Sequence, residues 1–147
     1  MRDQVSVFED AFNLLCGAKV GDGMSRTVFE CELWKGHVVK VEKDPHRFQN
    51  VLEWEVWRRV SETSLCRWFA PCKHLSPNGQ ILIMERTYPA PPDLYPKKMP
   101  AFFTDMKREN FGILDGKLVC HDYAVNLLME RGMTRAFRNA DWWSNSD

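Results

Sequence analysis

Hydrophobic and polar positions alternate along two neighbouring stretches in the first half of the chain. Residues 27–34, TVFECELW, and residues 37–43, HVVKVEK, are rich in β-branched and aromatic side chains. A period of two residues is typical of a strand with one buried face. Because Lys35 and Gly36 lie between the two stretches, we predict a β-hairpin with its turn at these residues.

Two further pairs of strands are predicted on the same grounds. Residues 70–76 and 80–86 are separated by the turn-forming sequence Pro-Asn-Gly at 77–79. Residues 111–122, FGILDGKLVCHD, contain the dipeptide Asp115-Gly116 between alternating hydrophobic positions. Asp-Gly in this setting is one of the strongest short-range signals for a hairpin.

Helical spacing of apolar residues appears in three other stretches. Residues 5–17 have apolar side chains on one face, and Gly17 is placed to follow a helix as its C′ residue. Residues 50–60, NVLEWEVWRRV, predict a helix of about three turns. Residues 123–143 are also predicted to be helical, with an interruption near Gly132.

A proline-rich stretch separates the two parts of the chain. Five of the fourteen residues in TYPAPPDLYPKKMP, positions 87–100, are prolines, so we expect an irregular connector. The predicted domains are residues 1–88, a connector over 89–100, and residues 101–147. Strands and helices do not alternate regularly along this order, which predicts an α+β fold.

Composition and charge narrow the classes of function. The chain has 147 residues with 44% hydrophobic and 27% charged side chains, as expected for one soluble globular protein. Lys and Arg together number 20, as do Asp and Glu, so no basic surface points to nucleic acid or to a membrane. The first residues carry acids where a signal peptide would be apolar, so we expect a cytoplasmic protein.

The cysteine count is odd and contains no C-x-x-C pair, which favours reduced thiols packed mostly in the core. The five are Cys16, Cys31, Cys66, Cys72 and Cys120. Cys66, Cys72 and His74 do not follow a familiar zinc-ligand spacing, so a zinc site is disfavoured.

The strongest chemical signal lies in residues 104–124, TDMKRENFGILDGKLVCHDYA. Asp105 and Asn110 stand in D-x-x-x-x-N spacing, and the hairpin that follows them ends at Asp122. Oxygen ligands such as those of Asn110 and Asp122 suit a hard cation such as Mg²⁺. Asp105 could accept a proton from an attacking hydroxyl, and Lys107 could neutralise a phosphoryl group. Phosphoryl transfer requires these parts.

These motifs resemble those of the protein-kinase superfamily. TDMKREN is similar to the catalytic loop H-R-D-L-K-x-x-N, and VCHDYA stands where that family has D-F-G. The resemblance implies that Asp105 and Lys107 are catalytic residues. It also implies that Asn110 and Asp122 bind Mg²⁺.

The first half of the chain carries the remaining motifs in the same order. VGDGMSRTVF resembles the Gly-rich loop, with Gly21, Gly23 and Val28 in register. HVVK resembles V-A-I-K, which makes Lys40 the lysine that contacts the ATP phosphates.

Two more segments extend the resemblance across about residues 18–124. LEWEVWRRV resembles helix C, whose glutamate pairs with the lysine, and we favour Glu53 over Glu55 for this role. ILIMER resembles the fifth strand and hinge, with Met84 at the gatekeeper position and Glu85 at the start of the hinge, where the family binds adenine. The implied fold is a kinase-like N-lobe, an antiparallel sheet plus helix C, with a strongly reduced C-lobe.

The chain also departs from the family pattern. Phe103-Thr104 replaces His-Arg, Tyr123-Ala124 replaces Phe-Gly, and Arg26 replaces the third loop glycine. No activation segment or A-P-E motif follows Asp122. In its reduction the chain resembles miniature kinase-fold proteins encoded by bacteriophages, which would place it in the host cytoplasm.

Simpler explanations exist for several of these residues. Gly21 and Gly23 could be turn residues, and Lys40 could face solvent on an alternating strand. Trp142 and Trp143 fit equally well a latch that closes the fold or an exposed anchor for a protein partner.

Three functions therefore remain open from the sequence. The first is an ATP- and Mg²⁺-dependent phosphotransferase with an unknown acceptor. The second is a pseudokinase-like module with weak or absent catalysis that binds a host protein, and the third is a structural part of an assembly. The first requires Lys40 and Asp122 to meet at one nucleotide.

Overall fold

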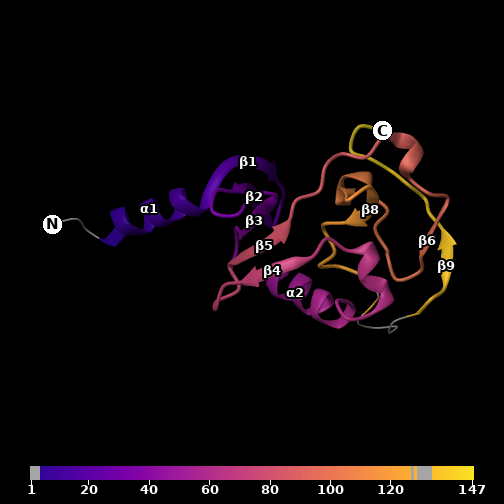
Figure 1. Ribbon diagram of the computed structural model, residues 1–147, viewed down its shortest axis with the longest axis horizontal. Coiled ribbons are helices and arrows are strands. Elements are labelled where there is room, and N and C mark those ends of the chain that lie inside the picture. The colour runs from indigo at the N-terminus through magenta and orange to yellow at the C-terminus, as the bar shows by residue number, and fades with distance from the viewer. Residues whose placement is uncertain (1–3, 127, 129–133) are drawn as a thin grey trace. The chain divides into compact units, whose positions relative to one another are not determined.

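The computed structural model describes residues 4–126, 128 and 134–147. The chain forms two compact units. The first contains Met1–Val51 and Cys72–Arg86, and the second contains Leu52–Pro71 and Thr87–Asp147. The second unit thus includes residues 52–71, which the sequence prediction grouped with residues 1–88. Figure 1 shows the elements of both units.

A five-stranded antiparallel sheet dominates the first unit, in the order β1-β2-β3-β5-β4. Its strands are β1 (Cys16–Asp22), β2 (Arg26–Cys31), β3 (His37–Glu42), β4 (Cys72–Leu75) and β5 (Ile81–Glu85). The two predicted hairpins of this unit are confirmed, because β2 pairs with β3 and β4 pairs with β5. Strand β1 was not predicted as a strand.

The turns of these hairpins have the expected glycine geometry. Gly36 and Gly79 have positive φ angles of 74° and 76°. At Gly79 an added Cβ would also lie 2.6 Å from Cγ2 of Val51, so the position is restricted by both conformation and space.

Side chains along β3 point alternately to the two faces of the sheet, so the apolar Val39 and the charged Lys40 lie on opposite faces. Val39 is fully buried and packs with Cys16 and Cys31 in the core of the unit. Partly buried side chains complete this core: Leu15, Phe29, Val41, Ile81 and Ile83. Lys40 follows Val39 and therefore belongs to the opposite face of the strand.

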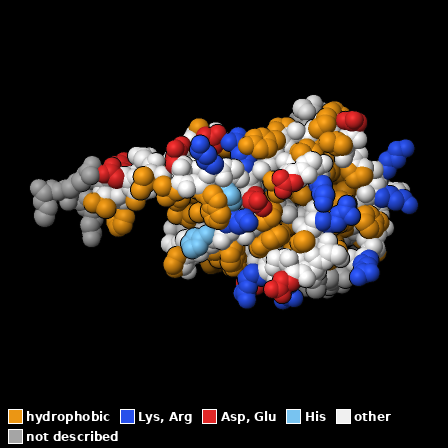
Figure 2. All heavy atoms as spheres, viewed as in Figure 1, with side chains coloured by type: hydrophobic (Ala, Val, Ile, Leu, Met, Phe, Trp, Pro, Cys, Tyr) orange, Lys and Arg blue, Asp and Glu red, His pale blue; other side chains and the backbone are white. Residues whose placement is uncertain are grey.

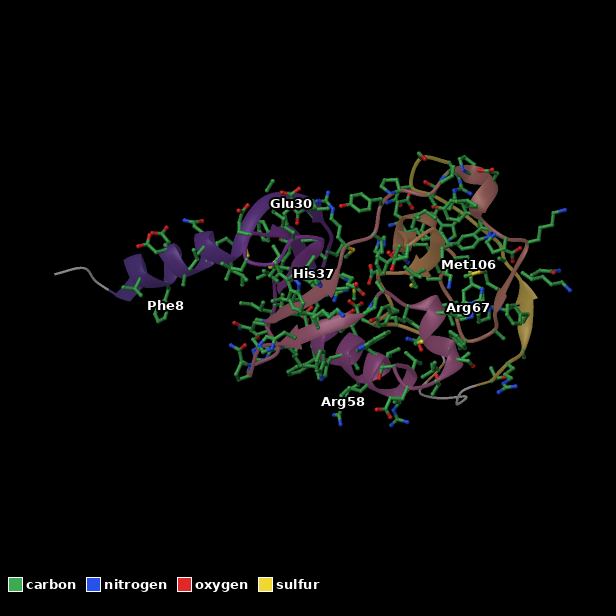
Figure 3. The ribbon with its side chains drawn as sticks, viewed as in Figure 1. Phe8, Glu30, His37, Arg58, Arg67 and Met106 are labelled. Atoms are coloured by element: carbon green, nitrogen blue, oxygen red, sulfur yellow. The ribbon has the colours of Figure 1, made fainter. Side chains whose placement is uncertain are left out.

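Helix α1 (Gln4–Leu15) precedes the sheet and confirms the predicted first helix. Phe12 packs edge-on against Phe29, with ring centroids 5.4 Å apart. Val7, Phe8 and Leu14 are exposed, and the sticks of Figure 3 show Phe8 projecting from the helix. Hydrophobic side chains accordingly appear on the surface of α1 in Figure 2.

The prediction that Gly17 ends this helix as a C′ residue is wrong. The chain passes directly from Leu15 into β1, and Gly17 lies within that strand. The backbone N–H of Glu32 donates to the Leu15 carbonyl at 2.8 Å, so the sheet satisfies a carbonyl at the helix end.

Helix α2 (Gln49–Val60) confirms the predicted second helix, and its residues from Leu52 onward belong to the second unit. The other elements of this unit are η1 (Ser64–Trp68), η2 (Pro92–Leu94), β6 (Lys98–Pro100), η3 (Arg108–Asn110), β7 (Phe111–Leu114), β8 (Lys117–Cys120) and β9 (Phe137–Asn139). The predicted hairpin at Asp115-Gly116 is confirmed: β7 pairs with β8, and φ is 51° and 77° at the two turn residues.

An aromatic cluster forms the core of the second unit. The ring of Phe69 lies 5.7 Å from Phe102, 5.3 Å from Phe103 and 4.9 Å from Tyr123. Phe111 joins the cluster through Phe103 at 5.4 Å. All five side chains are buried.

The predicted helix over residues 123–143 is wrong in its described final part. Residues 134–136 have no regular structure, and Phe137–Asn139 forms strand β9. This strand pairs with β6, inside the stretch predicted to be an irregular connector. Residues 127 and 129–133, including the interruption expected near Gly132, lie outside the described residues.

The predicted fold class is confirmed. The chain is α+β, with a five-stranded antiparallel sheet, a helix between β3 and β4 in chain order, and a second unit built largely from short elements. Within the described residues, none of the helices combines the length and apolar character needed to cross a bilayer.

Candidate active site

The loop before β7 brings Asp105 and Asn110 together. The Asn110 side-chain amide donates to Oδ2 of Asp105 at 3.2 Å. The other carboxylate oxygen, Oδ1, accepts the backbone N–H of Lys107 at 3.2 Å and the indole N–H of Trp143 at 3.1 Å. Asp105 is exposed, and three donors from three residues fix the orientation of its carboxylate.

Lys107 contacts the same tryptophan. Its ammonium group lies 5.4 Å from the centroid of the Trp143 ring, within the range of a cation–π contact. The sequence motif predicted Asp105 and Lys107 but gave no role to Trp143 beside them. No spacing signal could have identified it, because the contact joins residues 38 positions apart.

The β7–β8 hairpin brings Asn110 beside the segment that leads to Asp122. Phe111 pairs with Cys120, and the backbone N–H of His121 donates to the Asn110 carbonyl at 2.9 Å. The side-chain nitrogen of Asn110 is engaged by Asp105, so its amide oxygen is the atom suited to bind a cation. Asp122 is exposed and supplies a carboxylate next in sequence. These two oxygen ligands fit Mg²⁺, which binds one or two protein ligands and keeps several waters.

His121 holds the hairpin in place. One ring nitrogen, Nδ1, lies 2.7 Å from the Thr87 hydroxyl, and Nε2 lies 2.8 Å from the Glu109 carbonyl. Because a carbonyl only accepts, Nε2 carries the proton. The imidazole therefore connects residues from three segments of the second unit.

Glu53 is fully buried and binds the backbone after Asp122. Its Oε2 accepts the N–H groups of Tyr123 at 2.9 Å and Ala124 at 3.1 Å. Glu55, the alternative acid, is half-buried and bonds Arg58 at 3.3 Å on the same helix. Glu53 is thus the acid of α2 that is held inside the second unit, and its predicted pairing with Lys40 stays a prediction.

Tyr123, which stands in the place of the family's Phe, is anchored on the aromatic core. Its hydroxyl donates to the Ala70 carbonyl at 2.8 Å, and its ring is 1% exposed. Phe103, in the place of the motif's His, is 3% exposed and packs in the same core. Apolar burial therefore fixes the chain at these two departures from the family motif.

In the first unit, the Gly-rich segment forms the end of β1 and the turn into β2. Gly21 pairs with Val28, and Gly23 N–H donates to the Arg26 carbonyl at 2.9 Å. An added Cβ at Gly21 would meet no atom within 4 Å, and at Gly23 it would meet only the Arg26 carbonyl at 3.6 Å. Neither glycine is required by space or by a positive φ, so the open backbone at these positions is available to a ligand.

Lys40 lies on the central strand β3, paired with Val28 and Leu82. It is 3% exposed, so the alternative that it faces solvent is wrong. A buried ammonium group needs polar partners, which makes Lys40 more than a surface residue of an alternating strand.

Arg26 was expected as a cationic side chain in the loop. It instead opens β2 opposite Glu42 and is 7% exposed, with its guanidinium donating to Oδ1 of Asn50 at 3.0 Å. Asn50 is fully buried and also donates to the carbonyls of Lys40 and Gln80, both at 3.0 Å. Arg26 therefore helps to join β2 and β3 to the start of α2.

Met84 and Glu85, assigned to the adenine site by resemblance, end strand β5. Met84 is fully buried between Val38 and Cys72 in the strand order. Glu85 is half-buried, with its carboxylate 4.0 Å from the ammonium group of Lys73. The structure places Met84 in the packed interior of the first unit and Glu85 at its margin.

Trp142 and Trp143 are both bound within the second unit. The Trp142 indole donates to the Pro96 carbonyl at 2.7 Å, and its ring meets Tyr95 at 4.9 Å and Phe111 at 5.0 Å. Of the two alternatives for this pair, the contacts of Trp142 agree with the latch, whereas Trp143 is 43% exposed.

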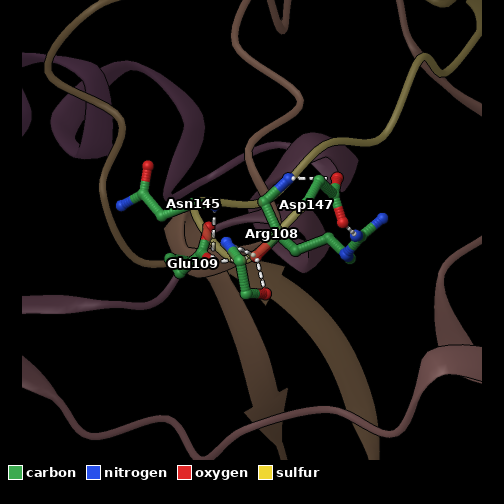
Figure 4. Close-up of polar contacts among 6 residues, drawn as sticks. Arg108, Glu109, Asn145 and Asp147 are labelled. Atoms are coloured by element: carbon green, nitrogen blue, oxygen red, sulfur yellow. Dashed lines mark hydrogen bonds and ion pairs between the residues drawn. The ribbon is translucent and has the colours of Figure 1, made fainter.

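Residues after Trp143 bind the loop that carries Asp105 (Figure 4). Arg108 forms an ion pair with Asp147 at 2.7 Å. Glu109 accepts the Ser144 hydroxyl and the Asn145 N–H, the latter at 3.2 Å. The hydrogen bond from Ser144 is the main cause that lowers the pKa of Glu109 below its ordinary value.

Within the described part of the chain, no three His, Cys, Asp or Glu side chains gather as a metal site. The disfavoured zinc site at Cys66, Cys72 and His74 accordingly finds no support. Mg²⁺ would need no such group, because it binds one or two protein oxygens and keeps several waters.

No protein-family model matches the chain, and no curated protein matches it. Among solved structures, the chain is similar to one titled as a streptomycin–ATP–APH(2")-IIa ternary complex, with 20% sequence identity and a TM-score of 0.41. The match covers 58% of this chain and 29% of that chain, so this chain spans less than a third of that protein's length. This similarity does not assign the chain to a family.

Proposed function

We propose that the chain is a minimal ATP- and Mg²⁺-dependent phosphotransferase of the kinase type. The observation that carries this proposal is the contact between Asp105 and Asn110. The D-x-x-x-x-N spacing becomes a direct hydrogen bond of 3.2 Å, next to the hairpin that leads to Asp122. A proton acceptor and oxygen ligands for a cation are thereby supplied by one short loop and one hairpin.

Asp105 and Lys107 act on the reacting groups. Asp105 accepts the proton of the acceptor hydroxyl while that oxygen forms a bond to the γ-phosphorus. The bond between the γ-phosphorus and the bridging oxygen breaks, and ADP leaves. Lys107 places a positive charge near the transferred group.

The other site residues bind the nucleotide. Asn110 and Asp122 hold Mg²⁺, which neutralises charge on the phosphates. Lys40 contacts the α- and β-phosphates, with Glu53 as its partner, and the backbone at Gly21 and Gly23 lies against the phosphates. Val28, Met84 and Glu85 form the adenine site.

Binding is tested by titrating the purified chain with ATP, with and without Mg²⁺, and by measuring thermal unfolding. Nucleotide at 100 times its Kd should stabilise the fold by about 2.7 kcal/mol. We expect Lys40→Met and Asp122→Ala each to abolish this stabilisation. Lys117→Met and Asp93→Ala alter exposed residues of the same types and should keep it.

Transfer is tested by incubation with ATP labelled at the γ-phosphate. Autophosphorylation or slow hydrolysis is expected in the wild type and should be lost in Asp105→Ala. A wild-type chain that shows no Mg²⁺-dependent nucleotide binding would contradict the proposed function.

Binding without transfer would instead support the pseudokinase-like alternative. Phe103 and Tyr123, at the two altered motif positions, are both buried in the aromatic core. A protein partner and the resemblance to miniature bacteriophage kinases stay predictions. The two alternatives differ in the transfer assay and in the host protein that the pseudokinase-like module is expected to bind.

A further inference from the structure

Residues 143–147, which we name the tail segment, lie along residues 105–110, which we name the loop segment. The contact begins with the backbone: Arg108 N–H donates to the Trp143 carbonyl at 2.7 Å, and Trp143 N–H donates to the Met106 carbonyl at 3.1 Å. Lys107 and Trp143 thereby form a parallel β-bridge. Met106, which accepts one of these bonds, is 4% exposed and anchors the loop segment in the second unit.

Trp143 makes side-chain contacts with both proposed catalytic residues. Its indole N–H donates to Oδ1 of Asp105 at 3.1 Å, and its ring lies 5.4 Å from the Lys107 ammonium group. The side chain is nevertheless 43% exposed. Core packing therefore explains little of its placement, in contrast to Trp142, whose ring meets two buried or half-buried aromatic residues.

The rest of the tail segment binds Arg108 and Glu109 of the loop segment (Figure 4). Ser144 and Asn145 donate to the Glu109 carboxylate, and Asp147 pairs with Arg108 at 2.7 Å. Asp147 also accepts the Ser144 N–H at 2.8 Å, which closes the segment on itself. Each end of the loop segment is thus tied to the tail segment by hydrogen bonds or ion pairs.

The Asp105 carboxylate keeps capacity for an acceptor hydroxyl. An ionised carboxylate offers about four lone-pair sites. Three donors reach Asp105, from Lys107, Asn110 and Trp143. One further donor can therefore be accepted, in a direction that the other three bonds define.

We propose that Trp143 is a positioning residue that sets the orientation of Asp105 and Lys107, and that residues 144–147 hold it there. This inference rests on the proposed phosphotransferase function. The family brace at His-Arg is absent, because Phe103-Thr104 occupies that place. The tail segment instead contacts the loop segment at Asp105, Lys107 and Arg108.

The kinetic test uses Trp143→Phe, which keeps an aromatic ring for Lys107 and removes only the N–H to Asp105. We expect kcat for ATP turnover to fall about tenfold, comparable to the loss of one hydrogen bond to a charged group, while KM for ATP stays within about twofold. Trp143→Leu also removes the ring and should lower kcat further. In Trp143→Phe the unfolding temperature should change little, because the side chain is 43% exposed and an aromatic ring is kept.

Trp142→Phe is the matched control. It removes an indole N–H of the neighbouring residue, whose acceptor is the Pro96 carbonyl. We expect a lower unfolding temperature and unchanged kcat. A Trp143→Phe variant with wild-type kcat would overturn the inference, and so would an increased kcat, which would indicate that the tail segment obstructs Asp105.

A second measurement does not depend on turnover. The Trp143 indole N–H resonance should shift, and its hydrogen exchange should accelerate, in Asp105→Ala. The Trp142 indole resonance should stay unchanged. If the Trp143 indole resonance and its hydrogen exchange are unchanged in Asp105→Ala, the hydrogen bond between Trp143 and Asp105 is contradicted. A wild-type chain without nucleotide binding or turnover overturns the proposed function, and the positioning role with it, whatever this resonance shows.

Discussion

Gly21 and Gly79, two glycines of the first unit, differ in whether the structure leaves room for a Cβ atom. A Cβ at Gly21 meets no atom within 4 Å, whereas at Gly79 it lies 2.6 Å from a Val51 methyl group at a φ of +76°. The structure thus requires glycine at 79 and does not require it at 21. A requirement at Gly21 would have to come from a ligand that approaches the backbone.

This contrast gives a matched pair of variants. We expect Gly79→Ala to destabilise the fold by about 1–2 kcal/mol, through strain at positive φ and crowding against Val51. Gly21→Ala should leave the unfolding temperature unchanged and weaken ATP binding about tenfold, because the methyl group would meet the phosphates. Chemical denaturation and ATP titration measure the two effects. Unchanged ATP affinity in Gly21→Ala would count against a phosphate site at this backbone.

At the scale of elements, local signals predicted the three hairpins and the helices α1 and α2, but the helix predicted over residues 123–143 is wrong in its described final part. Lys35-Gly36 and Asp115-Gly116 marked turns whose glycines have positive φ, as the turn types require. Strand β1 was missed because CGAKVGD contains two glycines and few β-branched residues. Strand β9 was missed because its partner β6 lies among prolines, so only tertiary pairing stabilises it.

Local sequence motifs predicted only the part of the candidate site whose residues are close together in the sequence. Asp105 and Asn110 lie five positions apart, so a local motif could place them together. Trp143 and Asp105 are joined across 38 positions by the path of the tail segment, which no local pattern encodes. Arg26 was also misplaced by the motif, which assigned it to the Gly-rich loop, whereas it opens β2 and binds Asn50 inside the first unit.

The turn from β1 to β2 carries a charge cluster whose pH dependence can be stated. Asp22 accepts a hydrogen bond from Lys43 at 2.5 Å, and Lys19 lies 3.6 Å away. The hydrogen bond from Lys43 is the main cause that lowers the pKa of Asp22 in the folded chain. Since the folded pKa is below the unfolded one, the contribution to stability is complete above about pH 4 and is lost as pH falls through the folded pKa.

We therefore expect Asp22→Asn to lower the unfolding temperature slightly at pH 6 and to have no effect near pH 2. Thermal unfolding of both proteins between these values measures the difference. Repeating the series in about 1 M salt should shrink the difference at pH 6, because the groups are exposed and salt screens them. A difference that grows toward low pH would show that the aspartate does not stabilise the fold in its ionised form.

Across the whole molecule, the two units use different core chemistry. The core of the first consists of two cysteines and mostly aliphatic side chains, with Phe29 as the one aromatic residue in this cluster. The second packs aromatic rings around Phe69 and fixes buried polar groups such as Glu53 with backbone donors. Each unit buries a charged side chain whose burial the sequence alone left open. These are Lys40 in the first unit and Glu53 in the second.

Chemical labelling of the five cysteine thiols would measure how far solvent reaches the cores of both units. All are free, and four are buried, which confirms the expectation of reduced cysteines packed mostly in the core. Cys66 is the half-buried exception. Burial is the main cause that raises the pKa of Cys16, and the neighbouring Cys31 raises it further. The reactive thiolate of Cys16 therefore forms only above the pH at which an ordinary thiol ionises.

We expect a thiol reagent at neutral pH to label one cysteine of the native chain rapidly, and the other four only after denaturation. Cys66→Ser should abolish the rapid phase, whereas Cys31→Ser should leave it intact. At about pH 8.5, where an ordinary thiol is half ionised, Cys16 should still resist labelling because it is both buried and protonated. Mass spectrometry of the labelled peptides assigns each site. Two or more rapidly labelled cysteines would show that one of the two cores opens to solvent in the native chain.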